Sequence, residues 1–132
     1  MSIGNYVFND CSSLKNVIFE DGSKNLSLGY NYISTSTDPN NTGYGLFNDC
    51  PLDSIHLGRN LSYGKTFGYG YSPFYNNVNL QSVTISDSVI SIGECLFRNC
   101  SSLTSINIPK GITMIGEYAF CNCNNPTKIV LS

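Results

Sequence analysis

The feature that most restricts the fold of this chain is a phrase that returns along its length, as "FNDCSSLKNVIF" from Phe8 and "FRNCSSLTSINI" from Phe97. Its phenylalanine occurs five times, with separations of 39, 27, 23 and 23 residues between the copies. These anchors are Phe8, Phe47, Phe74, Phe97 and Phe120. A period of roughly 20 to 50 residues indicates a solenoid or another stacked array, because each unit must bury its apolar face against a neighbour.

Further positions keep the same phase in each copy. Three residues after the phenylalanine come Cys11, Cys50, Asn77, Cys100 and Cys123. A leucine or proline follows, and then two apolar residues in alternation: Val17/Phe19, Ile55/Leu57, Val83/Ile85, Ile106/Ile108 and Ile129/Leu131. An apolar residue followed by glycine closes each unit, at Ile3-Gly4, Leu28-Gly29, Tyr63-Gly64, Ile92-Gly93 and Ile115-Gly116. A glycine at such a place suits a tight corner where a side chain would clash or where φ turns positive.

The pattern of one unit predicts its structure. The alternating apolar segment is typical of a short strand with one buried face. A coil of about 23 residues places each strand beside the previous one, which gives a parallel sheet along one face of a solenoid. The Phe–Cys segment is predicted to form the opposite wall as a short helical or 3₁₀ turn, with both side chains pointing inward. We therefore expect residues 1–132 to form a single solenoid of about five coils, mostly β.

At this point the residues resemble a known family. The consensus "IGxxAFxxCxxLxxIxIPxxITxIG" is similar to the BspA-like leucine-rich repeats of bacterial and protist surface proteins, most strongly over residues 78–131. The resemblance implies a right-handed leucine-rich-repeat solenoid, of the α/β repeat class, within a secreted or cell-surface protein. It implies partners that are proteins of a host matrix or of neighbouring cells, and it carries no catalytic residues. The chain starts inside a repeat and stops after a strand, so we expect a fragment of a longer protein, or a very short member of the family whose ends associate.

Two insertions break the period, at residues 30–46 and 65–73, just before the phenylalanine turn. Both are rich in Tyr, Gly, Ser and Asn, residues that favour loops. Their tyrosines are Tyr30, Tyr32, Tyr44, Tyr69 and Tyr71. Such side chains suit recognition of a ligand, and they also serve to cover the solenoid edge. The segment "NYISTST" has a second interpretation as an additional edge strand.

The outward positions of the predicted strands form a polar surface. These candidate partner-binding residues are Asn16, Ile18, Ser54, His56, Ser82, Thr84, Ser105 and Asn107. Strands about 4.8 Å apart would make them a flat strip with almost no charge. This is the usual binding surface of a solenoid, and it is also simply the exterior of a sheet.

Six cysteines raise the question of a disulfide or a metal site. Four lie in one column of the repeat, and Asn77 takes the fifth place, so the position does not require a pair. The spacing lacks the CxxC pairs of a structural zinc site. We expect buried free thiols that fill space, with a disulfide as the next alternative. His56, the only histidine, is expected to be one surface residue in a row, without partners for catalysis.

Composition excludes several function classes. Only 12% of the residues are charged and the net charge is −2, with no basic patch, so binding of nucleic acid is not expected. No apolar run approaches the roughly 18 residues that span a bilayer, and no signal peptide is visible. We expect a non-enzymatic module without cofactors that binds protein, with carbohydrate as a second partner class, through the strip or the tyrosine-rich loops. The alternative is a structural spacer without a ligand.

Overall fold

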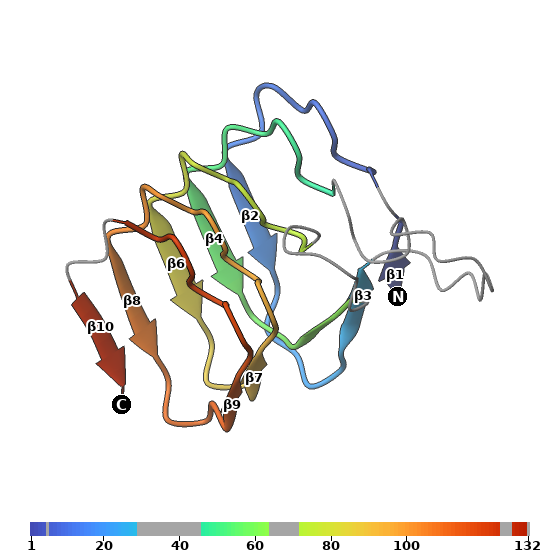
Figure 1. Ribbon diagram of the computed structural model, residues 1–132. Coiled ribbons are helices and arrows are strands. Elements are labelled where there is room, and N and C mark those ends of the chain that lie inside the picture. Colours follow the sequence, from blue (N-terminus) through green and yellow to red (C-terminus); the bar gives the residue numbers. More distant parts are fainter. Residues whose placement is uncertain (5, 29–45, 64–71, 125–127, 132) are drawn as a thin grey trace.

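In the computed structural model, the structure describes residues 1–4, 6–28, 46–63, 72–124 and 128–131. Its main layer is a five-stranded parallel sheet in the order β10-β8-β6-β4-β2, which confirms the predicted sheet (Figure 1). The strands of this sheet are β2 (Asn16–Phe19), β4 (Ser54–Leu57), β6 (Ser82–Ile85), β8 (Ser105–Ile108) and β10 (Lys128–Leu131). Each strand belongs to one copy of the repeated phrase, so the sheet grows by one strand per coil.

A second flank of the coils is built from shorter strands. Two parallel sheets lie there, with the orders β1-β3-β5 and β7-β9. The strands are β1 (Ser2–Ile3), β3 (Leu26–Leu28), β5 (Leu61–Ser62), β7 (Ser91–Ile92) and β9 (Met114–Ile115). Between β5 and β7 a side chain replaces the backbone ladder. Oδ1 of the buried Asn60 accepts hydrogen bonds from the N–H groups of Ile90 (2.9 Å) and Ser91 (3.2 Å).

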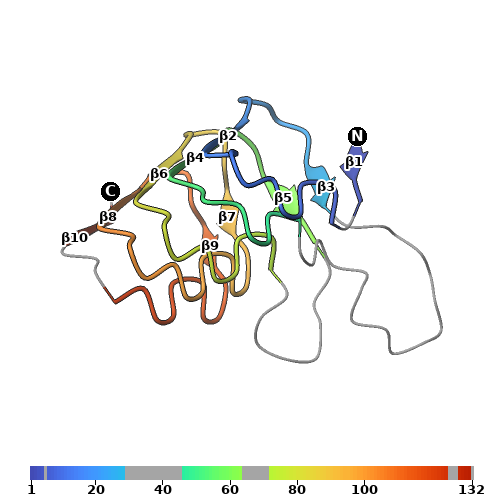
Figure 2. The same ribbon diagram turned by 90° about the horizontal axis from the view of Figure 1, so that it is seen from above.

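The Phe–Cys segments line the side across from the large sheet (Figure 2), and they are turns and not helical segments. No residue in the described ranges is in an α- or 3₁₀-helix. In each turn the N–H three residues after the phenylalanine donates to its carbonyl, as Cys100 does to Phe97 over 3.1 Å. The residue before that donor has a positive φ, which stops a helix from continuing: Asp10, Asp49, Asn76, Asn99 and Asn122. Asp and Asn tolerate this left-handed conformation better than other non-glycine residues.

The five anchor phenylalanines form a continuous stack inside the turns. Neighbouring rings are nearly parallel, with centroids 5.3 to 5.7 Å apart from Phe8 to Phe120. Phe19, from β2, meets the rings of Phe47 and Phe74 edge-on, at 6.4 and 6.0 Å. The inward residues of the large sheet, such as Ile55 and Ile106, complete the core. Stacking of coils therefore buries what no coil buries alone.

Buried thiols of the cysteine column donate hydrogen bonds to backbone carbonyls of the preceding coil. The Sγ–H group of Cys50 donates to the carbonyl of Phe8 (2.9 Å), and Cys100 and Cys123 make the same contact with Phe74 and Phe97 at 3.3 and 3.2 Å. Burial raises the pKa of the Cys100 thiol to about 12. All six cysteines are free, and the four buried ones fit the expected space-filling role, whereas Cys11 and Cys121 are partly exposed.

The glycine corner of the repeat is explained by crowding. A Cβ on Gly116 would lie 2.5 Å from the backbone nitrogen of Glu94 in the preceding coil. The sequence offered two reasons for glycine at this corner, a clash with a side chain or a positive φ. At Gly116 the clash is the reason. The ends of the insertions also belong to the coils, because Leu46, Ser72 and Pro73 are buried. The rest of both insertions lies outside the described residues.

Candidate functional site

The outward residues of the large sheet come together as the sequence predicts. Asn16 is paired with Ser54, Ser54 with Ser82, and Ser82 with Ser105, one residue per strand. A parallel row runs from Ile18 to His56 and Thr84, and Asn107 is paired with Val130 on β10. We call these residues the sheet strip: Asn16, Ile18, Ser54, His56, Ser82, Thr84, Ser105 and Asn107. Of the inward residues from β4 to β8, Ile55, Leu57, Val83, Ile106 and Ile108 are buried, whereas Ile85 is partly buried.

Side-chain contacts order this surface. The hydroxyl of Ser54 donates to Oδ1 of Asn16 over 2.7 Å, across the first two strands of the sheet. At the end of the row, Ile18 is 71% exposed on β2. Lys15 and Asp53, just before β2 and β4, form an ion pair of 3.9 Å that is open to solvent. A pair of this kind contributes little stability, so the strip is held mainly by its strands and by short hydrogen bonds.

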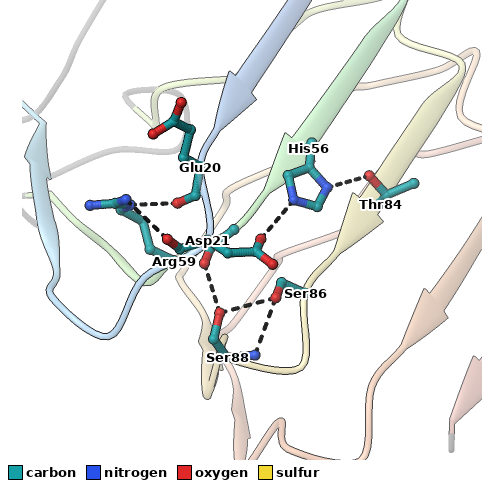
Figure 3. A network of polar contacts seen from close by, with 8 residues as sticks. Glu20, Asp21, His56, Arg59, Thr84, Ser86 and Ser88 are labelled. Carbon is teal, nitrogen blue, oxygen red and sulfur yellow. Dashed lines mark hydrogen bonds and ion pairs between the residues drawn. The ribbon is translucent and has the colours of Figure 1, made fainter.

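His56 is the centre of a polar network that joins three coils (Figure 3). Its Nε2 lies 2.9 Å from Oδ1 of Asp21, which follows β2, and its Nδ1 lies 2.8 Å from the hydroxyl oxygen of Thr84 on β6. An ionised carboxylate only accepts hydrogen bonds, so the ring nitrogen that faces Asp21 carries the proton. In the neutral ring Nδ1 is then the acceptor for the Thr84 hydroxyl. The network therefore fixes both the orientation and the tautomer of His56.

A close backbone contact brings Asp21 to His56. A Cβ on Gly58 would lie 2.2 Å from the carbonyl oxygen of Phe19 and 2.4 Å from the nitrogen of Asp21, so only glycine allows this approach. Gly58 donates its N–H to Phe19 (2.7 Å) and accepts from the N–H of Gly22 (2.9 Å). The segment after β2 is thus clamped against the segment after β4.

Arginine and serine side chains complete the clamp. Nε of Arg59 donates to the carbonyl of Glu20 (2.7 Å), and Nη2 approaches the carbonyl of Asp21 (3.4 Å). Ser88 donates to the carbonyl of Gly58 (2.7 Å), and its hydroxyl lies 3.0 Å from that of Ser86. These contacts tie the third coil to the first two, as the dashed lines of Figure 3 show.

The environment of Asp21 favours its charged form. The hydrogen bond from His56 is the main cause that lowers the pKa of the Asp21 carboxyl, and Ser86 and Arg59 act in the same direction. The order carboxylate, imidazole, hydroxyl also occurs in hydrolase triads, where the imidazole is the base for a nucleophile beside an oxyanion hole. Here the hydroxyl belongs to Thr84, an exposed residue of a sheet face. The arrangement can hold a polar surface rigid and offer hydrogen bonds to a partner.

The remaining sequence predictions concern the tyrosines of the insertions, a metal site and a membrane span. Tyr30, Tyr32, Tyr44, Tyr69 and Tyr71 lie outside the described residues, as does the segment "NYISTST". Across the described ranges, no three His, Cys, Asp or Glu side chains gather in a way that could hold a metal ion. Within the same ranges there is no helix with the length and apolar character needed to cross a membrane.

Sequence reasoning placed His56 on the strip but missed its partners. Asp21 is 35 residues away along the chain, and Arg59, Ser86 and Ser88 stand in turns without a motif. The one usable signal was the pair of glycines, Gly22 and Gly58, which stand three residues after β2 and directly after β4. It indicates a close approach without saying which side chains the approach brings together.

The fold and the sheet strip together define the class of protein, which is a parallel β-solenoid of stacked repeats with a polar outer sheet face. The family profile described as BspA type leucine rich repeat region, 6 copies, matches residues 1–32 and 68–132. The chain belongs to this family. Such repeats generally mediate protein binding, are typically non-catalytic and are typical of surface proteins. No curated protein and no solved structure matches the chain significantly.

Proposed function

We propose that this chain is an adhesion or recognition module of a secreted or cell-surface protein, and that it binds a protein partner through the sheet strip. The observation that carries the proposal is the network at His56, because it holds polar side chains from three coils in one arrangement at the exposed face. A surface that is ordered before binding loses less conformational entropy when a partner docks. The tyrosine-rich insertions 30–46 and 65–73 are a second contact surface in this proposal.

The partner class is protein of an extracellular matrix or of a neighbouring cell surface, by the resemblance of the repeats. The strip offers amides, hydroxyls and one imidazole, with Ile18 as an exposed apolar contact at its edge. Such a mixed and weakly charged surface fits the polar composition of transient protein interfaces. Carbohydrate on a glycosylated partner would meet the same hydrogen-bonding groups.

A panel of immobilised matrix and cell-surface proteins tests the proposal by biolayer interferometry. We expect at least one specific partner, and we expect Ser82→Arg, in the middle of the strip, to weaken its binding by about tenfold or more. Ser13→Arg is the matched control, because Ser13 is an exposed serine in the turn before β2 and off the strip. Equal binding of wild type, Ser82→Arg and a His56→Ala variant would overturn the strip as the binding surface. A spacer would bind no member of the panel.

A further inference from the structure

The backbone ladder that joins the turns is interrupted between the second and third coils. In a regular pair of coils the left-handed residue of one turn donates its N–H to the next turn, as Asp10 does to the carbonyl of Asn48 over 3.0 Å. The same spacing pairs Asp49 with Tyr75. Neither the Asp49 N–H nor the Tyr75 carbonyl has a hydrogen-bond partner among the residues that the structure describes. One backbone donor and one backbone acceptor are therefore left open on neighbouring turns.

This interruption lies beside the one irregular corner of the repeat, where the chain leads from a turn into the large sheet. A single residue, Pro51, separates the column position from the next leucine in the second coil, whereas Val78 and Asn79 do so in the third. Between the unequal corners there is a cavity of about 300 Å³, lined by residues 47–51 and 75–79. The cavity therefore follows from a local difference in the length of the repeat.

The cavity also holds a buried amide. Asn77 lines it and takes the column position at which Cys50, Cys100 and Cys123 each donate their Sγ–H to a phenylalanine carbonyl of the preceding coil. The Asn77 residue is only 6% exposed, yet its side chain makes no hydrogen bond to any residue in the described ranges. A buried polar group without a partner costs stability, and a bound molecule that pairs with it removes this cost.

The lining favours a neutral ligand rich in hydroxyl groups. Asn48, Asn76 and Asn79 add further amides, which donate and accept hydrogen bonds as hydroxyl groups do. None of the described lining residues is lysine, arginine or histidine, so an anion finds no opposite charge. The single carboxylate, from Asp49, is a poor substitute for the several oxygen ligands of a calcium site. Val78 is 45% exposed and offers an apolar contact for the C–H face of a sugar ring.

We propose that this cavity binds one ring of an N-acetylhexosamine, with the acetamido group in place of the missing rung. The acetamido carbonyl accepts from the Asp49 N–H, and the acetamido N–H donates to the Tyr75 carbonyl. The ring hydroxyls pair with the Asn77 amide and with the Asp49 carboxylate, which accepts from Nδ2 of Asn48 over 2.9 Å and keeps further lone pairs. The volume lies at the lower end of small-molecule pockets, as one ring requires. The site belongs to the turn side, across from the sheet strip (Figure 2), and goes beyond the proposed function.

Titration of the ¹⁵N-labelled chain with N-acetylglucosamine and N-acetylgalactosamine, followed by NMR, tests the site. We expect saturable shifts of the backbone amides of residues 48–50 and 76–79, with a Kd on the order of 1 mM for so small a ligand. Glucose and galactose are the matched probes without the acetamido group, and we expect them to bind about fivefold more weakly or less tightly still. Equal binding of the parent sugars would overturn the acetamido assignment. No saturable shift with either acetylated sugar, or the same shifts with calcium chloride alone, would overturn the site.

Matched variants decide which groups hold the sugar. Asn77→Cys restores the thiol that the other coils carry, so we expect a Tm no lower than that of wild type and sugar binding weaker by about fivefold. Asp49→Asn should weaken binding by a similar factor, whereas Asp10→Asn makes the same change in a turn of the same conformation and should have no effect. Ser82→Arg alters the strip and should leave sugar binding unchanged, so the two proposals fail separately. Equal sugar binding by wild type, Asn77→Cys and Asp49→Asn would refute the cavity as the site.

Discussion

Nε2 of His56 lies 2.9 Å from Oδ1 of Asp21, although the two residues stand in different coils and 35 positions apart. The contact depends on the clamp at Gly58 and on the parallel register of β2 with β4. It links the fold to the candidate site, since the same backbone approach that joins two coils also fixes the side chain at the centre of the strip.

The Asp21 carboxylate is expected to stabilise the fold in a pH-dependent way. Its pKa is lowered below the ordinary value of 3.8, chiefly by the hydrogen bond from His56. The folded state therefore binds this proton less readily than the unfolded state, and the contribution is present above pH 3.8 and is lost as the pH falls through the lowered pKa. Thermal unfolding at a series of pH values should show a lower Tm for Asp21→Asn than for wild type, with a difference that vanishes in acid. Asp87→Asn, at another exposed aspartate, is the control, and an equal effect of both variants would contradict the prediction.

The clamp at Gly58 should not accept a side chain. Gly58→Ala places a Cβ against backbone atoms of the segment after β2, which cannot move without breaking the pairing of the coils. We expect the free energy of unfolding to fall by about 3 kcal/mol, as for other overpacked sites. Gly4→Ala serves as the control, because its Cβ would meet only a side-chain carbon of Val7 at 3.7 Å. Urea unfolding of the two variants measures the difference, and a Gly58→Ala variant as stable as Gly4→Ala would refute the clamp.

The thiols of the repeat should divide into slow and fast groups. Cys100 is fully buried, donates to the carbonyl of Phe74, and has its pKa raised to about 12 by burial, so almost no thiolate is available at neutral pH. We expect a thiol reagent to modify Cys100 in the native protein at least about a hundredfold more slowly than the partly exposed Cys121. Peptide mass spectrometry after timed labelling distinguishes the two sites. Modification of both at one rate, before denaturant is added, would be inconsistent with the cysteine column as packed here.

The left-handed residue of each turn should prefer asparagine or glycine to alanine. Asn76 has a φ of 61° and an exposed side chain, so the substitution tests the backbone conformation with little loss of packing. Asn76→Ala should lower the free energy of unfolding by about 1 kcal/mol, whereas Asn76→Gly should change it by less than about 0.5 kcal/mol. Both values follow from urea unfolding. If alanine were tolerated as well as glycine, the turn would not need the left-handed conformation.

Much of the fold follows from the repeat. The phenylalanine anchors, the parallel order of the large sheet and the outward row at Ser54, His56, Thr84 and their neighbours all appear where the pattern predicts them. The predicted short helical or 3₁₀ turn is wrong, because an aspartate or asparagine with a positive φ follows each anchor phenylalanine. Their recurrence two positions after the anchor is the signal for a positive φ that ends the turn.

By itself the sequence determined the family, the coil and which side chains face the core, because a periodic pattern needs only local information repeated in phase. The tertiary structure alone decided which polar residues meet. Asp21 reaches His56 through the stacking of neighbouring coils, although the two residues stand 35 positions apart in the chain. Such contacts depend on register and on backbone approach at single glycines, and no periodicity in the sequence encodes the partner that the approach brings near.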